Sequence, residues 1–354
     1  MTRNIINIVQ EDLERIISVN LPWENLRNST VLISGANGSL PAYMVETLLY
    51  LNNIKNLNIQ VIGLVRNRNK ALDRFSNYQD RNDFKLLVQD VCTPIDDIEP
   101  IDYIIHTASQ ASPKYYTKDP VGTINANVLG THNLLTLAKR NQLKGFLFFS
   151  SGEVYGQVDD SQIPTQEDQY GYLDPMNLRS CYAESKRMAE TICVSWFRQY
   201  GLPTKIVRPF HTYGFGMSLD DGRVYADFVA DIINNRDIQI KSDGTATRAF
   251  CYIADATIGF FTVLLKGENG QAYNIGNDQC EISIFDLANK LINLFPEKSL
   301  KVIKDVDTND REYLKSNVSR NCPDITKVGN LGWKPTTSIE DGFTRTICSF
   351  LTYV

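Results

Sequence analysis

The sequence predicts an α/β protein built around a doubly wound parallel sheet. Short, almost wholly apolar runs recur between residues 31 and 149, as expected for strands that are buried on both faces. Segments with the apolar spacing of a helix separate these runs, and a glycine-rich turn follows the first of them. Because the strands of such a sheet run in the same direction, ligands are expected at their shared carboxyl edge.

The first predicted strand, residues 31–34, runs into a turn of residues 35–41 and then into a segment of helical spacing. Strand, glycine turn and helix start in this order are the context of a dinucleotide-binding loop. Glycines let the backbone approach a pyrophosphate, and the helix N-terminus favours its charge. Pro41 replaces the third glycine of such loops, and proline is acceptable in the first turn of a helix. The alternative is that these residues form a plain tight turn that binds no ligand. The loop residues expected to contact the dinucleotide are Gly35, Asn37, Gly38, Ser39 and Leu40.

The second predicted strand, residues 59–65, indicates which dinucleotide binds. A protein that binds NAD(H) usually carries an acidic residue at this strand end, for the ribose 2′-hydroxyl, and here the position holds Val65. Arg66 and Arg68 follow, and guanidinium groups suit a 2′-phosphate through bidentate hydrogen bonds and charge. The sequence therefore favours NADP(H), with NAD(H) possible. The alternative is that Arg66 and Arg68 are solvated loop residues that contact no cofactor.

Polar or small residues end the remaining predicted strands. Asp90 and Val91 are placed to meet an adenine edge, and Ala108 is small enough for a cofactor to lie against it. The fifth strand ends in hydroxyl groups and one carboxylate, which include Ser151 and Glu153. These strands are residues 84–88, 102–109 and 145–156, and a helix is predicted over 121–139 with Asn127 near its start.

Tyr182 and Lys186 stand four residues apart, so on a helix they share one face. An ammonium held near a phenol favours the phenolate, which lowers the tyrosine pKa from its usual value of about 10. Tyr182 is therefore a candidate proton donor and acceptor for a hydroxyl group near neutral pH. Taken alone, such a pair is more typical of a solvated helix face than of a catalytic site.

Composition narrows the class of protein further. A net charge of −5 gives no reason to expect a nucleic acid or an anionic membrane as partner, and no apolar run reaches transmembrane length. Seven scattered cysteines suit free thiols in a reducing compartment, so we expect a cytoplasmic protein. With three separated histidines no metal site is expected, and His106 is expected to satisfy a buried hydrogen bond.

Taken together, these motifs resemble the extended short-chain dehydrogenase/reductase family, also called the NAD-dependent epimerase/dehydratase family. Its usual substrates are nucleotide sugars. The resemblance extends from about residue 30 to the C-terminus. It rests on Gly35-x-x-Gly38, Asp90-Val91, His106-Thr107-Ala108, Asn127 with Gly130-Thr131, Ser151 before Val154-Tyr155-Gly156, Tyr182-x-x-x-Lys186, Arg208-Pro209, Arg248-Ala249-Phe250, Ala272-Tyr273-Asn274-Ile275-Gly276 and Leu331-Gly332-Trp333-x-Pro335.

The resemblance implies a role for each matched residue. Ser151 and Tyr182 would hydrogen-bond the substrate hydroxyl or carbonyl, with Tyr182 passing the proton and Glu153 beside them. Lys186 would hold the nicotinamide ribose and lower the pKa of Tyr182, and Pro209 would also border the cofactor. The residues expected to contact the nucleotide-diphosphate sugar are Ser109, Asn125, Arg179, His211, Arg223 and Arg248, although the last two could instead be structural ion-pair arginines.

The resemblance also implies an organisation. Residues 29–208 would form a Rossmann domain to which later segments return, and residues 209–354 would mainly form a smaller lobe that binds the nucleotide sugar. Residues 1–28 form an N-terminal extension, in which Ile8, Leu13, Ile16 and Ile17 fit a short amphipathic helix that packs on the main domain. A homodimer is expected, formed by pairing the helices near 127–140 and 182–200.

Within the family the chain is most similar to UDP-glucuronate decarboxylases, but its sugar pocket departs from theirs. Asn125 replaces their lysine, Gly152 a serine and His211 an asparagine, and residues 214–216 differ from their Gly-Pro-Arg. A buried carboxylate without a cation is costly, so this pocket favours an uncharged C6.

We therefore expect NADPH-dependent reduction of a 4-keto-6-deoxy nucleotide sugar. UDP-glucuronate decarboxylation and epimerisation are the alternatives, whereas 4,6-dehydration is disfavoured because Gly152 fills the position of its aspartate. A catalytically silent cofactor-binding regulator is a further alternative. The intact set of Ser151, Tyr182 and Lys186 argues against it, since a pure binder has no use for a tuned phenol.

Overall fold

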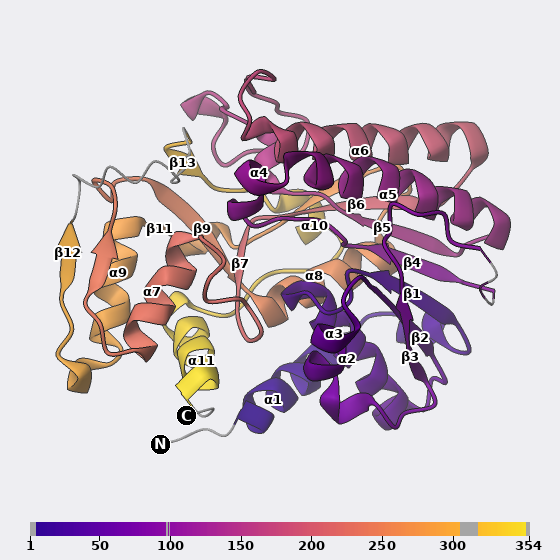
Figure 1. Ribbon diagram of the computed structural model, residues 1–354, viewed down its shortest axis with the longest axis horizontal. Helices are drawn as coiled ribbons and strands as arrows, with labels where there is room; N and C mark the ends of the chain where they lie inside the picture. The colour runs from indigo at the N-terminus through magenta and orange to yellow at the C-terminus, as the bar shows by residue number, and fades with distance from the viewer. Residues whose placement is uncertain (1–4, 97, 99, 305–317, 352–354) are drawn as a thin grey trace.

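The computed structural model describes residues 5–96, 98, 100–304 and 318–351. Its centre is a seven-stranded sheet in the order β10-β6-β5-β4-β1-β2-β3, with every neighbouring pair parallel (Figure 1). This confirms the predicted doubly wound α/β class. The strands are β1 (Thr30–Ser34), β2 (Gln60–Val65), β3 (Phe84–Val88), β4 (Tyr103–His106), β5 (Gly145–Phe149), β6 (Thr204–Pro209) and β10 (Ala272–Ile275).

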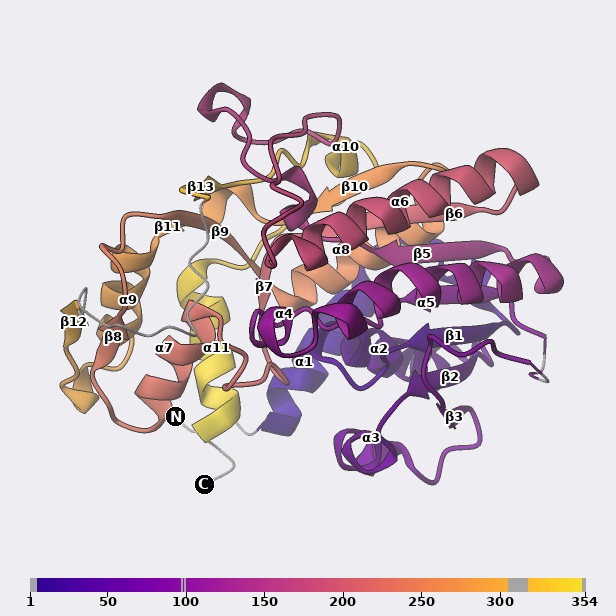
Figure 2. The same cartoon turned by 45° about the horizontal axis from the view of Figure 1, so that its top comes forward.

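Helices cover both faces of the sheet because its strands are apolar on both faces. Val31 and Ile33 of β1 face a core shared with α2 and α8, whereas Leu32 faces a second core shared with α5 and α6. α5 and α6 lie side by side over that second face (Figure 2). The helices of this part of the chain are α1 (Ile5–Ser18), α2 (Ser39–Lys55), α3 (Arg68–Arg74), α4 (Lys114–Lys118), α5 (Pro120–Asn141), α6 (Ser180–Tyr200) and α8 (Ile253–Lys266).

Two of the predicted strands end earlier than expected. β4 stops at His106 rather than residue 109, and β5 stops at Phe149 rather than residue 156. After β5 the Ser151 hydroxyl accepts a hydrogen bond from the Glu153 N–H at 3.2 Å, which starts a 3-10 turn, η3 (Gly152–Tyr155). The sheet edge therefore lies just before the polar residues, and these fold over it.

A second lobe is assembled mainly from residues after β6. β9 pairs with β7, β11 and β13, and β8 pairs separately with β12. α8 and β10 return from this part of the chain to the main sheet, where β10 pairs with β6. The elements of the lobe are β7 (His211–Tyr213), α7 (Val224–Ile233), β8 (Ile238–Ile240), β9 (Thr247–Tyr252), β11 (Glu281–Ser283), α9 (Ile284–Asn293), β12 (Val302–Lys304), β13 (Arg320–Asn321), α10 (Thr326–Gly329), which packs on β10, and α11 (Ile339–Leu351).

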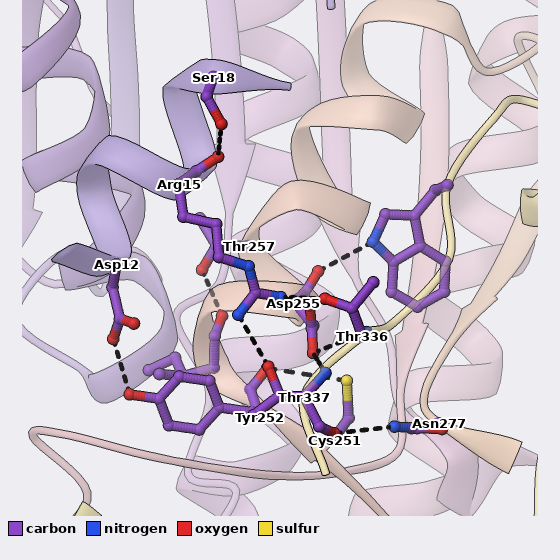
Figure 3. A network of polar contacts seen from close by, with 12 residues as sticks. Asp12, Arg15, Ser18, Cys251, Tyr252, Asp255, Thr257, Asn277, Thr336 and Thr337 are labelled. Carbon is purple, nitrogen blue, oxygen red and sulfur yellow. Dashed lines mark hydrogen bonds and ion pairs between the residues drawn. The ribbon is translucent and has the colours of Figure 1, made fainter. Parts of the chain in front are cut away.

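The N-terminal helix α1 packs against α2, α8 and α11 and so joins the two parts of the protein (Figure 1). Arg15 forms an ion pair with Asp255, the carboxylate of which also accepts the Thr337 N–H at 2.8 Å (Figure 3). One turn earlier Asp12 accepts from the Tyr252 hydroxyl at 2.7 Å and from the Arg345 guanidinium of α11 at 2.8 Å. Among the described helices, none is both long and apolar enough to cross a bilayer.

A buried ion pair fixes α6 to the sheet. The Arg208 guanidinium of β6 donates to both oxygens of Glu190 in α6, at 2.8 and 2.6 Å. Its three other N–H groups donate to the hydroxyls of Tyr155 and Tyr170, at 2.9 and 2.8 Å, and to the Glu167 carbonyl at 2.8 Å. Because all these donors are satisfied, the charge can remain in a site where the arginine side chain is only 1% exposed.

This pair leads to a stability prediction. Arg208→Met should lower the free energy of unfolding by about 3–5 kcal/mol, because the Glu190 carboxylate would stay buried without its partner. Arg140→Met is the matched control: it breaks the Arg140–Asp96 pair, which has the same 2.6 Å distance but is exposed, and should cost under about 1 kcal/mol. Urea denaturation measures both, and equal losses would contradict the prediction.

Candidate active site

A cleft of about 1360 Å³ opens at the carboxyl ends of the parallel strands, between the sheet and the second lobe. Pockets for one small molecule are roughly 300–1,000 Å³, so this volume suits two ligands. Most of the predicted site residues line it. They are Gly35, Asn37, Gly38, Ser39, Leu40, Arg66, Asp90, Val91, Ala108, Ser109, Asn125, Ser151, Glu153, Arg179, Tyr182, Lys186, Pro209, His211, Arg223 and Arg248.

Arg68 and Asn127 are the predicted site residues that do not line the cleft. The Asn67 side chain accepts the Lys70 N–H at 3.0 Å and so starts α3, which places Arg68 on the exposed first turn of that helix. Asn127 is fully buried behind the cleft and donates to the Ser185 hydroxyl at 2.9 Å, which ties α5 to α6. Asn67 and Lys70, which the sequence reasoning missed, do line the cleft.

Tyr182 and Lys186 lie one turn apart on α6 and both point into the site. The Tyr182 phenol is hydrogen-bonded to the Ser151 hydroxyl, which stands just beyond β5. The Lys186 ammonium donates to the Phe149 carbonyl at 2.7 Å and lies 5.8 Å from the centroid of the Tyr182 ring. The three side chains expected to carry the chemistry are therefore together in one place.

The pKa of Tyr182 is raised to about 12, not lowered as the sequence reasoning expected. Burial is the main cause, and the Ser151 hydrogen bond opposes it only in part. Burial also lowers the pKa of Lys186 to about 7, and its ammonium is directed at the Phe149 carbonyl. The polypeptide alone thus keeps the phenol protonated at neutral pH.

Glu153 and Tyr116 complete the wall around the phenol. Glu153 forms an ion pair with Arg179 at 3.6 Å. The Tyr116 ring of α4 stacks on the Tyr182 ring with centroids 5.2 Å apart and an angle of 18° between the planes. Sequence reasoning missed Tyr116, because no spacing along the chain relates it to Tyr182.

His106 lies beneath the site and has a structural role, as expected. Its Nδ1 is 2.8 Å from the hydroxyl oxygen of Ser34 at the end of β1. Burial, with a smaller effect of the Lys186 charge, lowers its pKa to about 3, so the imidazole stays neutral.

The turn after β1 fits a dinucleotide. Gly35 has φ +67°, and a Cβ added there would lie 2.9 Å from the Ala108 Cα, so only glycine allows the backbone and a ligand to approach at this point. α2 begins at Ser39 after Gly38, and no side chain caps its first N–H groups. Arg66 lines the same end of the cleft, 61% exposed and 3.8 Å from Asp90.

The cations at the opposite end of the cleft are already engaged by the protein. Arg223 pairs with Asp221 at 2.5 Å, and Arg248 donates to the carbonyls of Thr247 and Val318 at 2.7 and 2.9 Å. Burial and these two arginines hold the pKa of His211 well below its ordinary value, so its ring is neutral. This end therefore combines paired charges with neutral side chains.

The fold and the site define a nicotinamide-dependent enzyme of the extended short-chain dehydrogenase/reductase class. Residues 31–276 match the NAD dependent epimerase/dehydratase family, and the chain belongs to that family. It is 35% identical to UDP-glucuronic acid decarboxylase 5 of Arabidopsis thaliana over 317 residues, which are 89% of this chain and 87% of the plant protein. It is 31% identical to UDP-glucuronic acid decarboxylase 1 of Danio rerio over 90% of this chain and 72% of that protein.

Solved structures share the fold at lower identity. UDP-glucose 4-epimerase from Thermotoga maritima aligns with a TM-score of 0.78 at 22% identity, over 91% of this chain and 98% of that one. dTDP-glucose 4,6-dehydratase from Bacillus anthracis aligns with a TM-score of 0.73 at 20% identity, over 91% and 96%.

Proposed function

We propose that the protein reduces a 4-keto-6-deoxy nucleotide sugar at C4, with NADPH as the preferred reductant. The observation that carries this proposal is the lining of the cleft, where Asn125, Gly152 and the neutral His211 ring accompany the Tyr182 phenol in a volume large enough for two ligands. Reduction of a ketone needs an acid at the carbonyl oxygen, and a phenol with a pKa of about 12 holds its proton at neutral pH.

Each residue of the group has a distinct task in this reaction. A bound nicotinamide supplies the hydride. Ser151 and Tyr182 hydrogen-bond the carbonyl oxygen, and Tyr182 gives its proton to that oxygen as the hydroxyl forms. Lys186, held by the Phe149 carbonyl, keeps α6 and its phenol against the carboxyl end of β5.

The sugar end of the cleft favours an uncharged C6. Asn125 and Gly152 line it where the decarboxylases resembled by the sequence carry lysine and serine. Arg179 is paired with Glu153 and Arg223 with Asp221, while the His211 ring is neutral. A sugar carboxylate placed here would have to compete for these cations, at a cost in desolvation.

UDP-glucuronate decarboxylation is the second candidate. Relatives with that name match about nine-tenths of the chain, at 35% and 31% identity. The Arg179–Glu153 pair could also open to let the arginine bind a carboxylate. Supplying UDP-glucuronate and a 4-keto-6-deoxy nucleotide sugar in parallel separates the two reactions. We expect NADPH consumption with the second compound. Carbon dioxide release from the first compound, with no NADPH consumption on the second, would refute the reductase.

The Tyr182→Phe substitution tests the proton transfer. Turnover should fall roughly 10²–10⁴-fold, because no acid remains at the carbonyl oxygen, while NADPH binding stays nearly unchanged. Turnover is followed by nicotinamide absorbance and binding by fluorescence titration. Full activity in the substituted protein would exclude Tyr182 as the acid.

The Arg66→Ala substitution tests the cofactor preference. If Arg66 meets the 2′-phosphate, NADPH should bind more tightly than NADH, on the order of ten- to a hundredfold, and the substitution should remove most of that difference. Arg68→Ala serves as the control, since Arg68 lies outside the cleft and should leave the preference unchanged. Equal affinities for the two cofactors in the unaltered protein would contradict the proposal.

We also propose a homodimer formed by α5 and α6 of each copy. Large apolar side chains are exposed on these packed helices, including Leu129 on α5 at 47% and Met188 on α6 at 52%. Leu129→Glu should convert the dimer to a monomer in sedimentation velocity, whereas Ile54→Glu, at an equally exposed position of α2 (54%), should not. A monomeric unaltered protein at tens of micromolar would refute this assembly.

A further inference from the structure

The aromatic stack beside the phenol involves a residue that belongs to neither the catalytic group nor the glycine turn. Tyr116 is 3% exposed, and its ring lies nearly parallel to that of Tyr182, at 5.2 Å between centroids. Its hydroxyl donates to the Ala111 carbonyl at 3.1 Å, so the ring is held from its own segment. Offset stacking of this kind restricts both rings and excludes water from the shared face.

The helix that carries Tyr116 is tied to the second lobe. α4 has only the five residues Lys114–Lys118, and two side chains at its start reach the loop that precedes α7. Ser112 donates to the Asp221 carbonyl at 2.5 Å, and the Lys114 ammonium donates to the carbonyl and the carboxylate of Asp220, each at 3.0 Å. Asp221 in turn pairs with Arg223 in the cleft wall.

Tyr116 also lies beside the ion pair between Arg179 and Glu153. The guanidinium of Arg179 lies 5.7 Å from the Tyr116 ring centroid and is paired with Glu153. One ring therefore contacts the phenol and the Arg179–Glu153 pair, while its helix is anchored across the cleft.

We propose that Tyr116 is the positioning residue of Tyr182: it fixes the orientation of the phenol, shields one of its faces from water and links it to the second lobe through α4. This inference rests on the proposed role of Tyr182 as the acid. Tyr116 itself transfers no proton, since its hydroxyl is directed at the Ala111 carbonyl.

Loss of the ring should change the titration of Tyr182. The groups that face this phenol from other elements are Ser151, Glu153, Asp221, Arg223 and, on its own helix, Lys186. All of these remain in a Tyr116 variant, so the change would come from solvent access. Since burial is the main cause that raises the pKa of Tyr182 to about 12, admitting water should lower that pKa toward 10.

The experiment measures the phenolate of Tyr182 directly and needs no substrate. The ultraviolet phenolate absorbance of Tyr116→Leu is recorded against pH and corrected with the double variant that also carries Tyr182→Phe, which isolates one phenol. A shift of about one pH unit would raise the phenolate fraction at pH 11 about fivefold over the unaltered protein. Tyr116→Phe keeps the ring and should restore the unaltered titration, and Tyr115→Leu, on the same helix without the stack, should match the unaltered protein.

Kinetics provide the second measurement. With a 4-keto nucleotide sugar and NADPH, Tyr116→Leu should lower kcat about tenfold with little change in KM, and its activity should decline at a lower pH than that of the unaltered enzyme. If Tyr116→Leu fails to fold, Tyr116→Met fills a similar volume without a ring and replaces it. An unchanged titration in a folded ring-free variant, or a Tyr116→Phe protein as altered as Tyr116→Leu, would overturn the proposal. If the pKa of Tyr182 shifts as expected in Tyr116→Leu, but the unaltered enzyme does not turn over the keto sugar, the proposed reaction is refuted and the positioning role is not.

Discussion

The hydrogen bond from the buried Lys186 ammonium to the Phe149 carbonyl is the contact on which the site depends. It joins the first turns of α6 to the last residue of β5 and thereby places Tyr182 beside Ser151. A buried ammonium is costly, and burial lowers its pKa to about 7, but the carboxylate of Glu190 one turn further along α6 acts in the opposite direction. Glu190 is itself held by Arg208 of β6. One chain of contacts thus fixes a helix and two strands, and the orientation of the phenol follows from it.

The two ends of the cleft are built by different means. At the proposed cofactor end the backbone forms the surface: Gly35 leaves no space for a Cβ against Ala108, and α2 offers uncapped N–H groups. At the proposed sugar end side chains form the surface, among them Asn125 and His211. A backbone surface constrains the residue type strongly because only glycine fits, whereas a side-chain surface can change with one substitution. This difference is the physical basis for the proposal that the sugar pocket has changed more than the glycine turn.

The same difference sets what could be predicted from the sequence. The apolar runs, the glycine turn and the Tyr182–Lys186 spacing are local patterns, so they located the parallel sheet and the centre of the cleft. The ends of β4 and β5 depend on where the sheet edge lies, and the position of Arg68 depends on the Asn67 cap that starts α3. The pKa of Tyr182 depends on burial, and the ring stacked on this phenol belongs to Tyr116, a residue 66 positions earlier in the sequence. Periodicity contains no information about such long-range contacts.

The balance of charged side chains in the cleft bears on which substrate it can accept. At the proposed sugar end Lys114, Arg179 and Arg223 are matched by Asp220, Glu153 and Asp221. Arg248 donates to the carbonyls of Thr247 and Val318. In the proposed complex a nucleotide diphosphate would bring two negative charges to this end, and a uronate would add a third that the neutral His211, Asn125 and Gly152 do not offset. In a low-dielectric cleft that third charge would have to break a protein ion pair, which costs more than the new contact returns unless its geometry is very good. A sugar with an uncharged C6 adds no such cost, so the arrangement of charges supports the proposed substrate.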